Sequence, residues 1–193
     1  MITTGYWKML EDTRIKEAEA NIKNYLDSGM LKKTAKPDII VKNVLIRNSK
    51  ESLKVAEILF KNDYSDLWTI VCSYYSMYYI ANAVLYSKGY KVGDKITHKV
   101  TADALIVYVR KQLKGFLIEE YEEAKEDALE IAGIKADEII GSFDYERIKR
   151  SRIQYDTEET AKKSKAETSF KRAKEFVFEM EKLLPKDKRG ESL

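Results

Sequence analysis

The chain has 193 residues, of which 44% are hydrophobic, so it is long enough for one domain with a substantial core. Its 35 basic and 32 acidic residues leave a net charge of +3, which is too small an excess to indicate a nucleic-acid coat protein. The single cysteine, Cys72, excludes an internal disulfide and therefore a disulfide-stapled secreted scaffold. We expect one domain over residues 1–193, with residues 186–193 as a frayed polar tail.

The composition favours helices. Only two prolines and eight glycines occur, so the residues that interrupt helices are scarce. We expect an all-α fold, specifically an antiparallel up-down helical bundle of four to five main helices with short additional helices. The first residues lack the basic start and apolar run of an export signal, so we expect a soluble, cytoplasmic protein.

The first half of the chain predicts three long helices, which follow from apolar spacing and terminal residues. They are a helix over Gly5–Ser28 stopped by Gly29, a helix from the turn at Pro37 to Asn62 and Asp63, and a helix capped by Ser65 or Asp66 that ends at Lys88 and Gly89. The third is unusual, since Leu67–Ser87 contains no charged residue and its 21 positions are enough to cross a bilayer of roughly 30 Å. Its tyrosines cluster at mid-segment rather than near the ends, which predicts a buried central helix instead.

The second half predicts further helices. They are a helix capped by Thr97 and running through Val109, a glutamate-rich helix over Phe116–Ala132, a short helix over Tyr145–Arg152, and a final helix through Ala166–Leu184 that Pro185 ends. A break is expected around Ala136–Ser142, before the short helix.

Charge is distributed in blocks. The segment Gly115–Gly141 holds nine acidic residues against two lysines, while Arg147–Arg152 and Ala161–Lys174 are strongly basic. Solvated helix faces explain such blocks, and a surface for a partner is the alternative. The sequence gives the acidic segment no role beyond an edge helix.

Two stretches and their order carry a resemblance to a known family. The first runs from Cys72 to Tyr90 and is rich in tyrosine, and a Lys-Ile-Thr-His-Lys-Val segment from Lys95 follows it. The second is Phe143–Asp156, followed after a gap by Ala173-Lys-Glu-Phe-Val. Together with the Ser-Leu-Lys-Val-Ala segment from Ser52, they make the chain resemble the small stand-alone branch of the HEPN family over about residues 49–184.

This resemblance implies a helical bundle that usually forms a homodimer and works with a nucleotidyltransferase partner, in many cases as a toxin-antitoxin pair that acts on RNA. It also implies a metal-independent RNase motif, in which a histidine follows an arginine by four to six residues. The chain departs from that motif, because no histidine follows Arg147, Arg150 or Arg152 at this spacing. The one histidine, His98, lies before the predicted fourth helix.

The resemblance places candidate nucleotide- or RNA-binding residues in the second stretch. They are Arg147, Arg150, Arg152, Tyr155 and Asp156. Guanidinium groups bind phosphate oxygens through two parallel hydrogen bonds, although a solvated or salt-bridged face explains these arginines equally well. Tyr155 can stack on a base or be modified by a transferase, and a structural hydrogen bond is the simpler interpretation.

Two functions remain open. One is a binding or regulatory module whose arginine patch contacts a nucleotide or RNA phosphate. The other is an endoribonuclease in which Arg150 or Arg147 stabilises phosphate charge and His98 or Tyr155 transfers protons in place of the missing histidine. For His98, local packing is the alternative. The sequence predicts no cofactor and no metal site, since one histidine cannot supply the two Glu-x-x-His pairs of a di-metal bundle.

Overall fold

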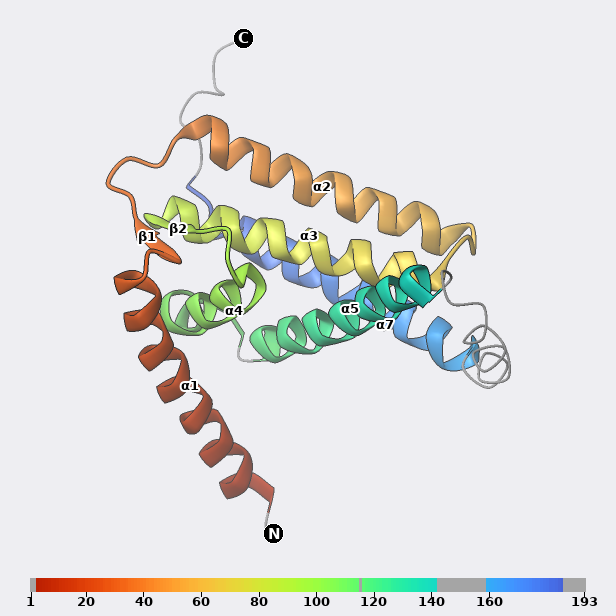
Figure 1. Ribbon diagram of the computed structural model, residues 1–193, viewed down its shortest axis with the longest axis horizontal. Helices are drawn as coiled ribbons and strands as arrows, with labels where there is room; N and C mark the ends of the chain where they lie inside the picture. Colours follow the sequence, from red (N-terminus) through yellow and green to blue (C-terminus); the bar gives the residue numbers. More distant parts are fainter. Residues whose placement is uncertain (1–2, 115, 142–158, 186–193) are drawn as a thin grey trace.

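The computed structural model describes residues 3–114, 116–141 and 159–185 and confirms the all-α fold (Figure 1). Its elements, in chain order, are α1 (Thr3–Asp27), β1 (Leu31–Lys33), α2 (Ile39–Lys61), α3 (Asp66–Ser87), β2 (Tyr90–Val92), α4 (Thr97–Tyr108), the 3-10 turn η1 (Arg110–Gln112), α5 (Phe116–Gly141) and α7 (Glu159–Glu181). Helices α2, α3, α5 and α7 run side by side with alternating directions, and α1 projects from one end of this group (Figure 1). None of the described helices is long and apolar enough to cross a membrane.

Helix α3 forms the centre of the molecule, as its uncharged sequence predicts. It contacts α2, α7, α5 and α4, and most of its side chains from Thr69 to Tyr86 are buried. Small residues allow close approach of the helices: the fully buried Ser49 hydroxyl of α2 donates a 2.7 Å hydrogen bond to the Ser76 carbonyl of α3. Ser65 caps the helix by accepting a hydrogen bond from the Trp68 amide, so one of the two predicted caps is correct.

A short antiparallel pair of strands was not predicted. Strand β1, which follows α1, pairs with β2, which follows α3, and Lys32 lies opposite Lys91 in this pairing. Three-residue strands carry too few residues for a recognisable alternation of polar and apolar side chains. Gly89 directly precedes β2 and has a φ of 88°. A Cβ at this position would lie 3.0 Å from the Thr34 carbonyl oxygen. Glycine is therefore required where the two strand segments approach each other.

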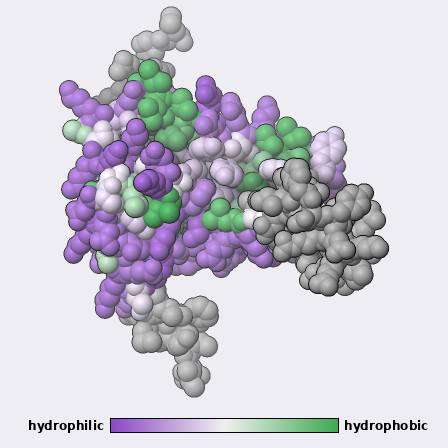
Figure 2. Space-filling view, in the orientation of Figure 1, coloured by the Kyte–Doolittle hydropathy of each residue, from purple (hydrophilic) through white to green (hydrophobic). Residues whose placement is uncertain are grey.

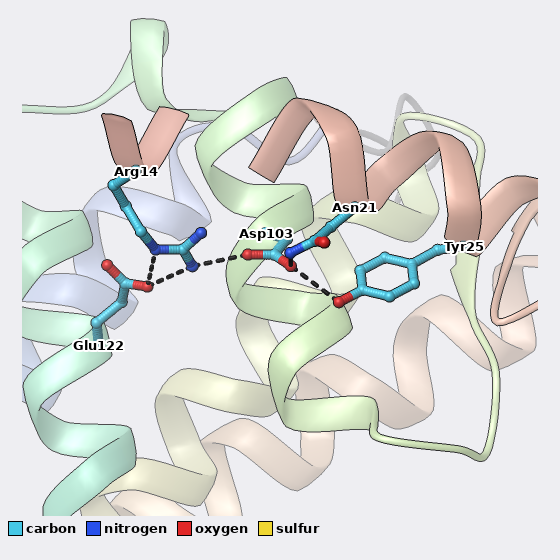
Figure 3. Close-up of polar contacts among 5 residues, drawn as sticks. All are labelled: Arg14, Asn21, Tyr25, Asp103 and Glu122. Carbon is cyan, nitrogen blue, oxygen red and sulfur yellow. Dashed lines mark hydrogen bonds and ion pairs between the residues drawn. The ribbon is translucent and has the colours of Figure 1, made fainter. Parts of the chain in front are cut away.

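Helix α1 is fastened to the bundle by a buried carboxylate (Figure 3). Asp103 of α4 is completely buried, and Arg14 of α1 forms a 2.7 Å ion pair with it. Asn21 and Tyr25 each donate a 3.0 Å hydrogen bond to the other carboxylate oxygen. Arg14 also contacts Glu122 of α5 at 2.6 Å. A buried charge is tolerated only when paired and hydrogen-bonded, so this cluster fixes α1, α4 and α5 relative to one another.

The acidic helix α5 lies against the basic helix α7. Arg172 contacts Glu123 at 2.6 Å and Glu120 at 3.7 Å, and Lys165 contacts Asp127 at 3.1 Å. Burial raises the pKa of Glu120 above its usual value. Some charges of the two blocks therefore form ion pairs between α5 and α7, and the others are solvated. The sequence alone had given the acidic segment no such role.

Several predicted boundaries were wrong. Helix α5 continues through Gly141 instead of ending near Ala132, so the break expected from residue 136 does not begin there. Thr97 is the first residue of α4 rather than its cap, and the preceding Ile96 has a left-handed backbone without a side-chain cap. Helix α2 begins after Asp38, which accepts from the Ile40 amide. The predicted short helix over Tyr145–Arg152 and the tail 186–193 lie outside the described residues.

Candidate functional site

Of the predicted site residues, the structure describes His98 alone. Five others lie in the segment between α5 and α7, outside the described residues: Arg147, Arg150, Arg152, Tyr155 and Asp156. The end of α5 and the start of α7, which this segment joins, lie at the end of the bundle where α2 ends and α3 begins (Figure 1). The roles given to these five residues stay predictions.

His98 is the second residue of α4 and packs against the tyrosines of α3. Its Nδ1 lies 2.7 Å from the Tyr74 hydroxyl. The ring centroid is 4.8 Å from that of Tyr78 and 6.0 Å from that of Tyr75. These contacts agree with the prediction of local packing for His98. They also give the imidazole a fixed position, which a general base or a hydrogen-bond donor requires.

Burial determines the protonation of this cluster. It lowers the pKa of His98 below the usual value, and the nearby positive charge of Lys125 on α5 lowers it further. Burial also raises the pKa of Tyr74, so the phenol stays protonated. His98 is therefore neutral at pH 7. Among the described residues, none forms a hydrogen bond with Nε2 of His98.

The pair Tyr74 and His98 can act in either direction. A hydroxyl both donates and accepts, so Tyr74 can support the imidazole tautomer with its proton on Nδ1 or the one with its proton on Nε2. In the first case Nε2 is a proton acceptor, and in the second it is a hydrogen-bond donor. The geometry fixes the imidazole but leaves both tautomers open.

The tyrosine cluster reaches the surface. Tyr74 and Tyr121 are buried, whereas Tyr75 is 36% exposed, and Trp68, two turns earlier on α3, is 54% exposed. Apolar residues are exposed on the neighbouring α2, and Figure 2 shows them gathered over both ends of that helix. They are Ile39, Ile40 and Val44 in the first two turns and Val55 and Ile58 towards the end. These exposed side chains are candidates for contacts with a partner.

Sequence reasoning missed Tyr74 and Lys125 as neighbours of His98. The tyrosine-rich pattern marks the helix, but only the packing of α4 and α5 on α3 decides which ring meets the imidazole. Asp103 was also missed, although a lone carboxylate in the apolar run from Val100 to Val109 is a recognisable signal of a buried polar contact. In the described part of the chain, no group of three histidine, cysteine or acidic side chains is placed to hold a metal ion.

Residues 43–183, well over half of the chain, match the family model described as the HEPN domain. The chain belongs to the HEPN family. The match includes α3, His98 and the segment between α5 and α7, and it excludes α1 and β1. Membership makes this protein a helical module of a nucleotide- and RNA-related family. A search of curated proteins and a search of solved structures each gave no match.

Proposed function

We propose that this HEPN protein is a cytoplasmic binding and regulatory module that holds a nucleotide or an RNA phosphate and works with a nucleotidyltransferase, as one half of a toxin-antitoxin pair. The observation that carries this proposal is the neutral His98 imidazole, held by Tyr74 beside a partly exposed tyrosine surface. Aromatic side chains stack on bases, and a fixed imidazole N–H donates to phosphate oxygens.

In this proposal the arginine segment adds positive charge for binding phosphate. Arg147, Arg150 and Arg152 present guanidinium groups within six positions, which suits bidentate binding of phosphate oxygens. Tyr155 and Asp156 complete the proposed contacts, with the tyrosine stacking on a base. Because each phosphate contact is electrostatic, binding should weaken as salt rises.

Binding of a fluorescent single-stranded RNA tests this proposal by anisotropy at low and high salt. We expect saturable binding that Arg150→Ala weakens on the order of tenfold, since one charge-assisted contact is lost. Arg47→Ala is the matched control, because Arg47 is an exposed arginine on α2 that pairs only loosely with Glu51, at 3.9 Å. Equal affinity for the unmodified protein and Arg150→Ala would exclude the arginine segment as the phosphate site.

A homodimer and a nucleotidyltransferase complex are part of the same proposal. The exposed apolar residues of α2 and the exposed Trp68 and Tyr75 of α3 give both partners a surface. Light scattering of the purified chain would measure the dimer. Co-expression with a small nucleotidyltransferase, followed by size-exclusion chromatography, would test the complex, and Val55→Glu should weaken whichever contact uses α2.

One observation favours a second candidate function, the metal-independent endoribonuclease. The lowered pKa of His98 leaves it able to accept a proton at pH 7, as a general base must. In this reaction the 2′-hydroxyl loses its proton to His98 and attacks the adjacent phosphorus. The bond from phosphorus to the 5′ oxygen then breaks, and that oxygen takes a proton from protonated His98 or from water, while Arg147 or Arg150 stabilises the charge on the phosphate.

Incubation of a mixed RNA pool with the protein and a chelator tests this candidate. Cleavage that is lost in both His98→Ala and Arg150→Ala, and kept in Lys99→Ala as a neighbouring control, would establish the nuclease. Intact RNA with the unmodified protein would leave the binding module as the function.

A further inference from the structure

A short chain of polar groups leads from the core of the bundle to His98. Nδ1 of His98 lies 2.7 Å from the hydroxyl of Tyr74, a residue of α3 that is only 1% exposed. The ring of Tyr74 in turn contacts that of Tyr121 on α5, with 5.8 Å between the centroids. Tyr121 is completely buried and stacks on Phe176 of α7. Exposure therefore rises along the chain from Tyr121 through Tyr74 to the partly exposed His98.

Each hydroxyl in this chain has one proton that needs an acceptor. Among the described residues, Nδ1 of His98 is the only close hydrogen-bond partner of the Tyr74 hydroxyl. The Tyr121 hydroxyl forms no close hydrogen bond within the same part of the chain, and it interacts with that of Tyr74. A buried donor without an acceptor is less tolerable than an oxygen with an unused lone pair. The number of protons therefore limits how the chain can be arranged.

Two arrangements are possible, and only one gives every proton an acceptor. In the first, Tyr121 donates to Tyr74 and Tyr74 donates to Nδ1. In the second, Nδ1 carries a proton and donates it to Tyr74, so Tyr74 must donate to Tyr121, and the Tyr121 proton stays in the core without a close acceptor among the described residues. The first arrangement is favoured, and it leaves the imidazole proton on Nε2.

The pKa values of the two tyrosines agree with this direction. Burial raises the pKa of Tyr74, and the hydrogen bond with Tyr121 opposes that rise. A phenol pKa falls when its oxygen accepts a hydrogen bond, because the bond stabilises the phenolate. Burial and then Tyr74 raise the pKa of Tyr121, as expected for the hydroxyl that donates. Tyr121 is therefore the donor and Tyr74 the acceptor.

We propose that Tyr74, supported by Tyr121, is a positioning residue that fixes the tautomer of His98 with its proton on Nε2. The contact at Nδ1 by itself allows both tautomers, and the burial of the two tyrosines decides between them. None of the described residues bonds Nε2, so its proton is available to an acceptor atom of a ligand. This role toward a ligand rests on the proposed function, whereas the tautomer does not. To act as a general base through Nε2, His98 would first need both hydroxyl groups to reverse.

NMR of the full chain with ¹⁵N-labelled histidine tests this inference at pH 7.5, and the signals need no assignment because His98 is the only histidine. We expect a directly bonded proton on Nε2 and none on Nδ1. The proton of the 2.7 Å contact should appear downfield without one-bond coupling to nitrogen, since it belongs to the Tyr74 oxygen. A proton coupled to Nδ1 in this way would overturn the inference.

The urea-unfolded protein is the reference, because a free imidazole exchanges between both tautomers. The ratio of the Nε2–H to the Nδ1–H tautomer, read from the ¹⁵N shifts, should be on the order of tenfold higher in the folded protein. Equal ratios in the folded and unfolded protein would show that the fold does not set the tautomer, and would overturn the inference.

Phenylalanine variants assign the effect to individual hydroxyl groups while keeping the rings. Tyr74→Phe should remove the downfield proton and move the tautomer ratio towards that of the unfolded protein, because the partly exposed ring can then turn either nitrogen to solvent. Tyr121→Phe should keep the Nε2–H tautomer and shift the downfield proton, since Tyr74 loses the donor that polarises it. Tyr75→Phe is the matched control, because the Tyr75 ring contacts His98 at 6.0 Å without a hydrogen bond between them. An unchanged spectrum in Tyr74→Phe would overturn the role of Tyr74, and one in Tyr121→Phe would overturn that of Tyr121.

Addition of single-stranded RNA separates this inference from the proposed function. We expect saturating RNA to shift the Nε2–H signal, because the ligand accepts this hydrogen bond. RNA that binds without shifting the signal would overturn the role of Nε2 toward the ligand. The expected tautomer without any RNA binding would overturn the proposed function and keep the positioning of His98. RNA binding to a protein with the proton on Nδ1 would overturn the positioning alone.

Discussion

The Tyr74 hydroxyl lies 2.7 Å from Nδ1 of His98, so the central helix of the bundle fixes the protein's single imidazole at the start of α4. The contact gives His98 both an orientation and a buried environment. The same environment that makes the imidazole a neutral acceptor at pH 7 also makes its protonation unfavourable in the folded state.

The stability of the protein should therefore depend on pH through His98. Its pKa in the folded state is lowered, by burial and then by Lys125, so the unfolded chain binds the proton more readily. The free energy of unfolding should be highest above about pH 6.5, the usual histidine pKa, and should fall as the pH drops through the lowered folded value. Urea unfolding between pH 7.5 and pH 5.5 measures this.

His98→Gln provides the control for that experiment, because glutamine keeps a hydrogen-bonding partner for Tyr74 without titrating. We expect its free energy of unfolding to change less between pH 7.5 and pH 5.5 than that of the unmodified protein. Identical slopes for the two proteins would show that His98 does not control stability in this range.

Removing Arg14 should destabilise the protein strongly. Arg14→Met leaves the fully buried Asp103 carboxylate without its cation, and breaking a buried pair in this way costs about 3–5 kcal/mol. Asp103→Asn should cost less, because the partly exposed Arg14 keeps Glu122 at 2.6 Å. Urea unfolding at pH 7 ranks the variants. The control is Arg47→Met in the exposed pair of Arg47 and Glu51, which should change the free energy of unfolding by only about 0.3–0.5 kcal/mol. An equal cost for Arg14→Met and Arg47→Met would contradict the structure.

Ser49 is buried where α2 packs against α3. Ser49→Ala removes its 2.7 Å hydrogen bond to the Ser76 carbonyl and should cost about 1 kcal/mol. Ser49→Leu should cost about 1–3 kcal/mol, since a larger side chain must separate the two helices. The melting temperature measures both effects. Lys54→Leu, at an exposed position of the same helix, should leave the melting temperature near that of the unmodified protein. An unchanged melting temperature in both leucine variants would show that α2 and α3 are not closely packed at Ser49.

The charges between α5 and α7 predict a dependence on salt. Arg172→Glu replaces a cation between Glu120 and Glu123 with a third carboxylate and should destabilise the protein by about 1 kcal/mol at low ionic strength. At 1 M salt the Debye length is about 3 Å, so the difference from the unmodified protein should shrink. Lys54→Glu controls for the change in net charge. A deficit that is independent of salt would indicate lost packing of the Arg172 side chain instead of lost charge pairing.

Much of the fold follows from local sequence. The uncharged run from Leu67 to Ser87 predicts the central helix, and Ser65 marks its start correctly, because capping and hydrophobic burial act over a few neighbouring residues. Errors occurred where local signals are weak or conflict. Helix α5 passes through Gly133 and ends at Gly141, although glycine and a run of mixed residues favoured an earlier end.

The sequence by itself determined the all-α class, the buried central helix, and the likeness to the HEPN family that the family model then established. Only the tertiary structure decided which groups meet: Tyr74 with His98, Arg14 with Asp103, Glu123 with Arg172, and Lys91 with Lys32. The physical reason is distance along the chain. Helical periodicity and caps are set by residues within a few positions, whereas these contacts join helices and strands far apart in sequence and depend on how the helices pack around α3.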